Sequence, residues 1–383
     1  MRQNLTALNG LRIFAAAVVI GFHYGMLTES FSRLPHFLQN VVGNGTIALP
    51  FFYLLSGFVL THAYAGRIAT PRQKRDFYLA RFARLYPAYL LSFVLFLPIA
   101  VEKYLRHPAI SQHHGPRTFV LGGALTVFAL QAWTSLSQTW NGPGWSLSVE
   151  AFFYFAFPLV LRRMVRMRSA PLVTALGILW LAMLSFTVAH EHNLIGAQIW
   201  YGYVLYQPLL WTPMFLLGMA TYRLASKWSQ VPDAVATSVS VFSLAALVVL
   251  CGLPPVEGGN LFVNGGAAPV IALVVLAYSH PRSLSSRVMG APVLSFLGGM
   301  SYLVYILQAP LWHMFRAVTD KLRHVHGQST VKDWQFLLYL PLLLGFAFAV
   351  QRLVEKPAQQ WLLSRRRQAV AKTEDGSSRV LAA

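Results

Sequence analysis

Charged residues are scarce in this sequence, and acidic residues are the scarcest of them. Only 11% of the 383 residues are charged, with 12 Asp and Glu in all, whereas 56% are hydrophobic. A water-soluble protein cannot cover its surface with so few charges, but a surface that faces lipid needs almost none. The composition therefore excludes an ordinary soluble enzyme and predicts one polytopic membrane domain, with no room for a separate soluble one.

Cysteine is also nearly absent, since Cys251 is the only one. A single cysteine excludes an intramolecular disulfide and any cysteine-rich metal site. Several histidines fall in predicted outer loops, but their spacing matches no helical metal motif, and no acidic cluster accompanies them. We therefore predict no metal site and interpret these side chains as solvated: His113, His114, His190, His192, His324 and His326.

Hydrophobic runs long enough to cross a bilayer recur along the whole chain. If all were spans and the N-terminus lay inside, the arginine cluster at 162–168 would lie outside, against the positive-inside rule. Treating 118–133 as re-entrant or peripheral returns every basic cluster to the inside. We therefore predict an all-α, polytopic transmembrane helical bundle of about ten spans, with both termini cytoplasmic. The candidate runs are 12–28, 46–65, 86–101, 118–133, 145–161, 171–189, 205–222, 234–252, 267–279, 294–318 and 334–353.

The net charge of +19 would suit a nucleic-acid-binding protein, but the predicted topology explains it. Most of the 31 lysines and arginines fall in predicted inner segments, as the positive-inside rule requires. We therefore predict no nucleic-acid partner, and membrane lipid is the expected surface partner. Residues 1–357 form the predicted membrane domain, and 358–383 form a basic cytoplasmic tail with a disordered end.

Two ionisable side chains, Arg12 and His23, lie inside the first hydrophobic run. They are eleven residues apart, so on a helix they point the same way to within about 20° and lie roughly 16 Å apart along the axis. Ionisable groups at membrane depth are costly and usually serve function or pairing. The pair suggests a polar channel, but a snorkelling Arg12 with a His23 bonded to a neighbouring helix explains it equally well.

Glu150 is the third ionisable residue well inside a predicted span, and it closes the run WNGPGWSLSVE. A carboxylate there could orient or deprotonate a histidine, or receive a hydroxyl proton. Alone, a helix-packing glutamate is slightly favoured. With His23 available as a partner, a functional role is favoured.

A basic face is predicted in the first inner loop, where Arg81 and Arg84 are three residues apart and Lys74 and Arg75 lie one to two turns earlier. Paired guanidinium groups suit phosphate, through bidentate charge-assisted hydrogen bonds. Anchoring to anionic lipid explains many such loops. On charge alone, lipid anchoring is the favoured interpretation.

Other polar residues fall at spacings that place them inside the helical bundle. Ser56 precedes a glycine in an aromatic-rich run, which permits close helix approach. Ser301, Tyr302, Tyr305 and Gln308 lie within two turns of a later run. They fit the path of a hydroxylated substrate and fit ordinary interhelical hydrogen bonding equally well.

These signals occur in a fixed order: Arg12 with ten residues before His23, LSGF at 55–58, Arg81-x-x-Arg84-x-x-Pro87, WSLSVE at 145–150 and SYLVY at 301–305. The ordered set closely resembles the acyltransferase-3 family, integral-membrane acyltransferases that O-acylate cell-surface glycans and some secreted small molecules. The resemblance covers about residues 5 to 357 and corresponds to the family's stand-alone type.

The resemblance implies about ten transmembrane helices in the bacterial cytoplasmic (inner) membrane. It implies acyl-CoA, most commonly acetyl-CoA, as a cytoplasmic co-substrate, with no permanently bound cofactor. It implies an acceptor hydroxyl on an extracytoplasmic carbohydrate such as exopolysaccharide or lipopolysaccharide. The implied essential residues are Arg12, His23, Arg81, Arg84 and Glu150. The chain departs from the family at Gln308, where many members have histidine, and at Pro50, where many have a small polar or acidic residue.

These residues permit a mechanism. Arg81 and Arg84, with Lys74 and Arg75, would hold the coenzyme phosphates while the pantetheine arm passes Arg12. His23 would be a general base or a transient acyl carrier, and Glu150 would orient it. Arg12 would stabilise either the oxyanion or a coenzyme phosphate, and the sequence leaves both open.

The rival function is a proton-coupled transporter or flippase of a glycan or small molecule, because buried Arg, His and Glu side chains also form proton relays. The sequence shows no repeated half and no matched pair of broken helices, which many transporters have. A scaffold for polysaccharide synthesis would leave the intramembrane charges unexplained. The acyltransferase is therefore the favoured prediction.

Overall fold

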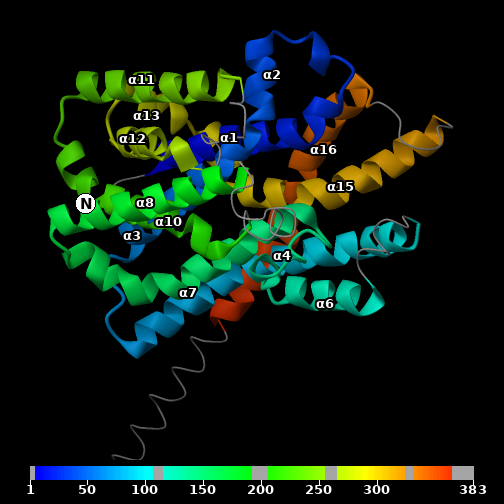
Figure 1. Ribbon diagram of the computed structural model, residues 1–383, viewed down its shortest axis with the longest axis horizontal. Coiled ribbons are helices and arrows are strands. Elements are labelled where there is room, and N and C mark those ends of the chain that lie inside the picture. Colours follow the sequence, from blue (N-terminus) through cyan, green and yellow to red (C-terminus); the bar gives the residue numbers. More distant parts are fainter. Residues whose placement is uncertain (1–4, 107–114, 192–205, 255–264, 324–330, 365–383) are drawn as a thin grey trace, which may run out of the picture.

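The computed structural model describes residues 5–106, 115–191, 206–254, 265–323 and 331–364. Within these ranges the chain is helical and forms no strand, apart from an isolated bridge between Thr28 and Val331. Figure 1 shows long helices packed side by side in one bundle. The helices are α1 (Thr6–Tyr24), α2 (His36–Gly43), α3 (Ala48–Tyr64), α4 (Pro71–Arg106), α6 (Pro116–Val127), α7 (Trp145–Arg166), α8 (Ser169–Glu191), α10 (Pro208–Trp228), α11 (Asp233–Gly252), α12 (Ala268–Tyr278), α13 (Leu284–Met289), α14 (Pro292–Gly299), α15 (Ser301–Leu322) and α16 (Asp333–Val350).

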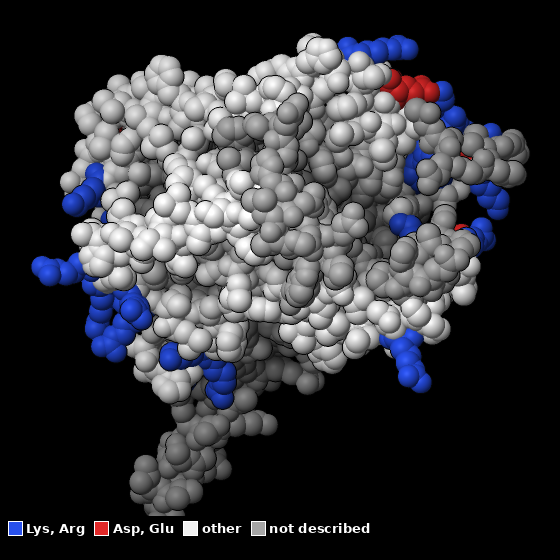
Figure 2. Space-filling view, in the orientation of Figure 1, with Lys and Arg blue, Asp and Glu red and all other residues white. Residues whose placement is uncertain are grey.

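The prediction of an all-α, multi-pass membrane protein is confirmed. Seven described helical segments are long and apolar enough to cross a membrane, and the bent pair α14–α15 makes an eighth if it counts as one span. Figure 2 shows the charged side chains near the edges of one face, whereas the described residues between them are uncharged, as a lipid-facing surface requires. The count of ten spans and the cytoplasmic termini remain predictions, and residues 365–383 of the predicted tail lie outside the described residues.

The segment 118–133 contains only a short helix. Helix α6 has 12 residues and is about 18 Å long, whereas the apolar core of a bilayer is about 30 Å thick. At its C-terminal end the backbone turns at Ala129, which has a φ of 53°. By length alone, α6 cannot span, which agrees with the re-entrant or peripheral interpretation of this segment.

Helix α4 is longer than the predicted run 86–101, because it has 36 residues and continues through Pro87 and Pro98. It starts with a capping box: the Gln73 N–H donates to Thr70 Oγ1 at 3.2 Å, and Gln73 Oε1 accepts from the Thr70 N–H at 3.0 Å. A proline at the first helical position suits this start. The basic face and the membrane-spanning part therefore belong to one continuous helix.

Two glycines let α3 and α10 pack backbone to backbone. A Cβ atom on Gly57 would lie 2.0 Å from the Phe215 carbonyl oxygen, and one on Gly218 would lie 1.8 Å from that of Leu54. Both distances are shorter than any real carbon–oxygen contact. The glycine after Ser56 thus sets the approach of the two helices, as predicted, and places Ser56 inside the bundle.

Helix α1 packs against the end of α13 and against α14 in the same manner. A Cβ atom on Gly10 would lie 1.9 Å from the Met289 carbonyl oxygen, and one on Gly298 would lie 1.6 Å from that of Asn9. This contact fixes the helical turn that carries Arg12. After Gly299 the chain bends by 54° into α15, so the single run predicted at 294–318 is in fact two helices that meet at Met300.

The close contact between α3 and α10 predicts a stability effect. Gly218→Ala should lower the melting temperature, because the backbones must separate and overpacking costs about 1–3 kcal/mol. Gly177→Ala is the matched control, since nothing lies within 4 Å of a Cβ atom at that position of α8. Intrinsic tryptophan fluorescence of the purified protein during heating measures both. Equal melting temperatures for the two variants would contradict the proposed contact.

Candidate active site

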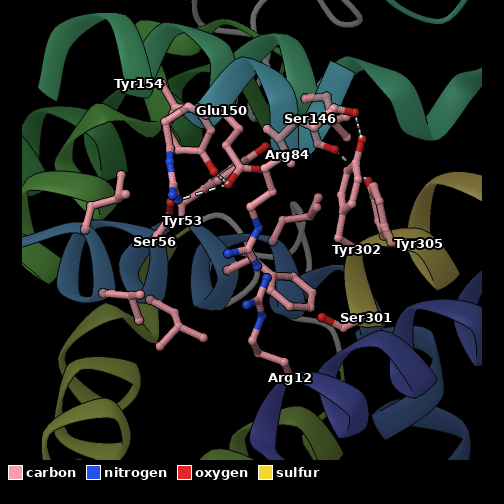
Figure 3. A pocket seen from close by; sticks show the side chains of 18 residues that line it. Arg12, Tyr53, Ser56, Arg84, Ser146, Glu150, Tyr154, Ser301, Tyr302 and Tyr305 are labelled. Atoms are coloured by element: carbon pink, nitrogen blue, oxygen red, sulfur yellow. Dashed lines mark hydrogen bonds between the residues drawn. The ribbon is translucent and has the colours of Figure 1, made fainter. Parts of the chain in front are cut away.

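One cavity gathers polar side chains from five helices, α1, α3, α4, α7 and α15 (Figure 3). Its volume is about 90 Å³, which is room for several water-sized groups at about 10–15 Å³ each. The polar residues that line it are Arg12, Tyr53, Ser56, Arg81, Arg84, Ser146, Glu150, Tyr154, Ser301, Tyr302 and Tyr305. Most of the residues predicted from the sequence therefore meet here.

The cavity is short of negative charge. Three guanidinium groups line it, those of Arg12, Arg81 and Arg84, whereas Glu150 is the single lining carboxylate. Figure 3 shows Arg12 and Arg84 pointing toward one another from opposite sides. Arg12 Nε is buried without a hydrogen-bond partner. Burying charges without partners is costly, so this arrangement fits a bound anion.

Arg81 is held by aromatic side chains. Its Nη2 donates to Tyr64 Oη at 3.3 Å, and its guanidinium carbon lies 5.6 Å from the Tyr64 ring centroid and 5.9 Å from that of Tyr154. Cation–π contact stabilises a positive charge without neutralising it. Sequence reasoning missed both tyrosines, although Tyr154 lies one turn after Glu150 and so shares its helix face.

Glu150 is bound by neutral hydroxyl groups. Tyr154 Oη donates to its Oε1 at 2.5 Å, and Ser56 Oγ donates to the same oxygen at 3.4 Å. Within the described ranges it forms no ion pair. The predicted contact between Glu150 and His23 does not occur: Glu150 lies at the level of Arg12, and His23 is eleven residues further along α1, roughly 16 Å away on a straight helix.

His23 is paired with Gln308. Its Nδ1 lies 3.3 Å from Gln308 Oε1, and Gln308 Nε2 donates to the Tyr305 carbonyl oxygen at 2.9 Å. That second bond orients the amide, so its oxygen accepts from an Nδ1–H group. The ring is then the tautomer with an unprotonated Nε2. Gln308, which stands where many family members have histidine, is thus the hydrogen-bond partner of the His23 ring.

Tyr302 and Tyr305 connect α15 to its neighbours. Tyr302 Oη donates to the Leu85 carbonyl oxygen at 2.7 Å. Tyr305 Oη accepts from Ser146 Oγ at 3.0 Å and lies 3.2 Å from the Pro143 carbonyl oxygen. These bonds hold the first turns of α15 against α4 and α7. They are structural as well as cavity-lining.

Lys74 and Arg75 do not reach the cavity. They lie near the start of α4, where Arg75 is exposed, about two turns before Arg81. The structure therefore divides the predicted basic face: Arg81 and Arg84 line the cavity, and the two earlier residues do not.

No metal site is found among the described residues, since no group of three His, Cys, Asp or Glu side chains could hold an ion there. Five of the loop histidines named above lie outside the described ranges: His113, His114, His192, His324 and His326.

The weak pairing of Arg84 predicts a small stability effect. Arg84→Met should leave the melting temperature nearly unchanged, because Arg84 is only partly buried and Glu355 attracts it without forming a close ion pair among the described residues. Arg316→Met is the control, since Arg316 Nη2 lies 2.8 Å from Asp320 Oδ2 and its loss leaves that carboxylate with only the more distant Arg323, at 3.9 Å. Thermal unfolding in one detergent compares them. A larger loss for Arg84→Met than for Arg316→Met would show that Arg84 is neutralised within the protein.

A family profile described as an acyltransferase domain matches residues 5–351. Acyltransferase MdmB of Streptomyces mycarofaciens is 32% identical over 161 residues, which is 40% of this chain and 38% of its own. No solved structure matches the chain.

Two further relatives match over most of the chain. Peptidoglycan O-acetyltransferase OatA of Listeria monocytogenes is 23% identical over 336 residues, which is 82% of this chain and 49% of its own. O-acetyltransferase OatA of Staphylococcus aureus is 23% identical over 384 aligned positions, covering 93% and 57%. The chain thus spans about half the length of the curated relatives it matches.

Proposed function

Because the chain belongs to the acyltransferase family whose profile matches residues 5–351, we propose that it is a membrane-bound O-acyltransferase. It moves an acyl group, acetyl in the simplest case, from cytoplasmic acyl-CoA to a hydroxyl group of an extracytoplasmic carbohydrate. Its location is the bacterial cytoplasmic membrane. Two relatives are named as O-acetyltransferases, one of them for peptidoglycan, which supports a cell-envelope glycan as the acceptor class.

The observation that carries the proposal is the cavity with three guanidinium groups and one carboxylate. An acyl-CoA molecule is strongly anionic at its nucleotide end and neutral along its pantetheine arm. Arginine is the side chain best suited to phosphate, because its planar donors match two oxygens at once. Arg81 and Arg84 therefore bind the phosphate end of the donor.

His23 supplies the base. The acceptor hydroxyl oxygen attacks the thioester carbonyl carbon, and His23 Nε2 takes the hydroxyl proton. The carbon–sulfur bond then breaks, the ester remains on the carbohydrate, and the leaving thiolate receives the proton from His23. The hydrogen bond from Nδ1 to Gln308 keeps Nε2 available for this transfer.

Glu150 acts at the other end of the donor path. Its hydroxyl partners Tyr154 and Ser56 hold the carboxylate at the cavity wall. There it limits the repulsion between the three arginines while the cavity is empty. It does not reach His23, so it shapes the donor cavity and takes no direct part in proton transfer.

Removal of the base is the first test of function. His23→Ala should abolish acyl transfer from radiolabelled acetyl-CoA to a peptidoglycan or polysaccharide acceptor by protein in liposomes, because the hydroxyl is left without a proton acceptor. General-base catalysis contributes about 10²- to 10⁴-fold in rate. His36→Ala, at the exposed start of α2, is the control and should retain activity. Near-wild-type transfer by His23→Ala would remove His23 from the chemistry. Transport of an unmodified glycan, without acyl-CoA, would favour a flippase.

The pairing of His23 with Gln308 makes a separate prediction. Gln308→Leu should lower kcat by about tenfold or more, because Nδ1 loses its acceptor and the tautomer is no longer fixed. Gln308→Glu keeps an acceptor at the same place and should retain far more activity. The KM for acetyl-CoA should change little in either variant. Equal kcat values for the two variants would show that Gln308 only fills space.

A further inference from the structure

Helix α15 begins inside the protein. Helix α14 ends at Gly299, the chain bends by 54°, and α15 starts at Ser301, whose exposed surface is only 1%. The backbone N–H of Met300 donates to the Leu297 carbonyl oxygen at 3.0 Å, and that of Val304 donates to the Met300 carbonyl oxygen at 3.0 Å. The N–H groups in the first turn of a helix have no acceptor within that helix. A helix N-terminus carries about half a positive charge.

The side chain of Ser301 gives independent support for a ligand there. Its Oγ is buried and has no hydrogen-bond partner, and it lines the cavity. Figure 3 shows Ser301 beside Arg12, away from Glu150 and Tyr154. Buried hydroxyl groups nearly always have a partner. Ser301 Oγ and Arg12 Nε are thus two buried donors, in one place, whose acceptor is not part of the described chain.

The groups that meet here can all donate hydrogen bonds. They are the α15 N-terminus, the Ser301 hydroxyl and the facing guanidinium groups of Arg12 and Arg84. Glu150, the single carboxylate of the cavity, binds Tyr154 and Ser56 instead. A group that satisfies several donors at once must be negative and must carry several oxygens, which describes phosphate.

We propose that the N-terminus of α15, Ser301 Oγ, Arg12 and Arg84 form a phosphate-binding site. This assignment rests on the proposed function for its ligand: the site holds the phosphate group next to the pantetheine arm of the acyl donor. Of the two roles that the sequence left open for Arg12, this proposal assigns it binding of a coenzyme phosphate and not stabilisation of the oxyanion.

The position of His23 indicates which part of the donor binds at Arg12, the phosphate group or the thioester. Arg12 and His23 belong to the same uninterrupted helix and lie roughly 16 Å apart along its axis. A thioester that reacts at His23 cannot place its carbonyl oxygen against Arg12 at the same time. The donor is long, so its phosphate end can occupy the Arg12 site while its thioester reaches His23.

The test compares 4′-phosphopantetheine with pantetheine, which differ only by the phosphate group. Isothermal titration on the full chain in phosphatidylcholine nanodiscs should show at least about tenfold tighter binding of the phosphorylated compound, as expected for several charge-assisted hydrogen bonds. Ser301→Ala should reduce this preference several-fold. Ser240→Ala is the matched control, because Ser240 is equally buried but bonds to its own helix in α11, and it should keep the preference.

Ser301→Asp separates binding from folding. A carboxylate at a helix N-terminus is stabilising, so this variant should melt no lower than wild type, while its charge occupies the site and abolishes the preference for 4′-phosphopantetheine. Equal wild-type affinity for the two compounds, or a Ser301→Asp variant that binds like wild type, would overturn the proposal. Loss of 4′-phosphopantetheine binding in nanodiscs containing phosphatidic acid would assign the site to a lipid phosphate and overturn the donor assignment.

Failure of this site and failure of the proposed function give different results. Ser301-dependent binding of 4′-phosphopantetheine without acetyl transfer would support the site and refute the acyltransferase. Acetyl transfer by Ser301→Asp with a wild-type KM for acetyl-CoA would support the acyltransferase and refute the site.

Discussion

An excess of positive charge in one cavity inside an apolar bundle is the constraint on which this structure depends. Arg12, Arg81 and Arg84 share one cavity with a single carboxylate. Their repulsion would move loosely packed helices apart. The helix contacts that oppose it are backbone to backbone, through Gly10 between α1 and α13 and through Gly298 between α1 and α14. Such contacts leave little freedom to relax. We infer that these charges lower the stability of the protein locally and that an anionic ligand, once bound, offsets this loss.

The straightness of α1 gives the site its second property. The helix carries Arg12 near its start and His23 in its last turn, so the proposed mechanism places phosphate recognition and acyl transfer at two different depths of the bundle. Different polar side chains lie near Arg12 and near His23. Glu150, with its partners Tyr154 and Ser56, lines the cavity of the arginines, and Gln308 orients His23. A long donor bound at the first level would therefore present its reactive end at the second.

Much of the fold and part of the site follow from the sequence, for clear physical reasons. Long apolar runs predict membrane helices, and the spacing of Arg81 and Arg84 puts both on one helix face, as observed. Lys74 and Arg75 are also basic, but they lie nearer the start of α4 and do not line the cavity. The spacing of residues along the chain does not show how deep in the bundle each side chain lies. The tyrosines around Arg81 depend on how α3, α4 and α7 pack. The bend before Ser301 was missed because an apolar run looks the same whether the helix is continuous or broken, and only the Gly298–Gly299 pair hinted at it.

A structure of the protein in nanodiscs with coenzyme A bound would test this mechanism most directly. We expect density for a phosphate group between Arg12, Arg84 and the first turn of α15, and the thiol end of the same molecule beside His23 Nε2. Phosphate density on Lys74 and Arg75, or on the arginine cluster at the end of α7, with the thiol remote from His23, would contradict it.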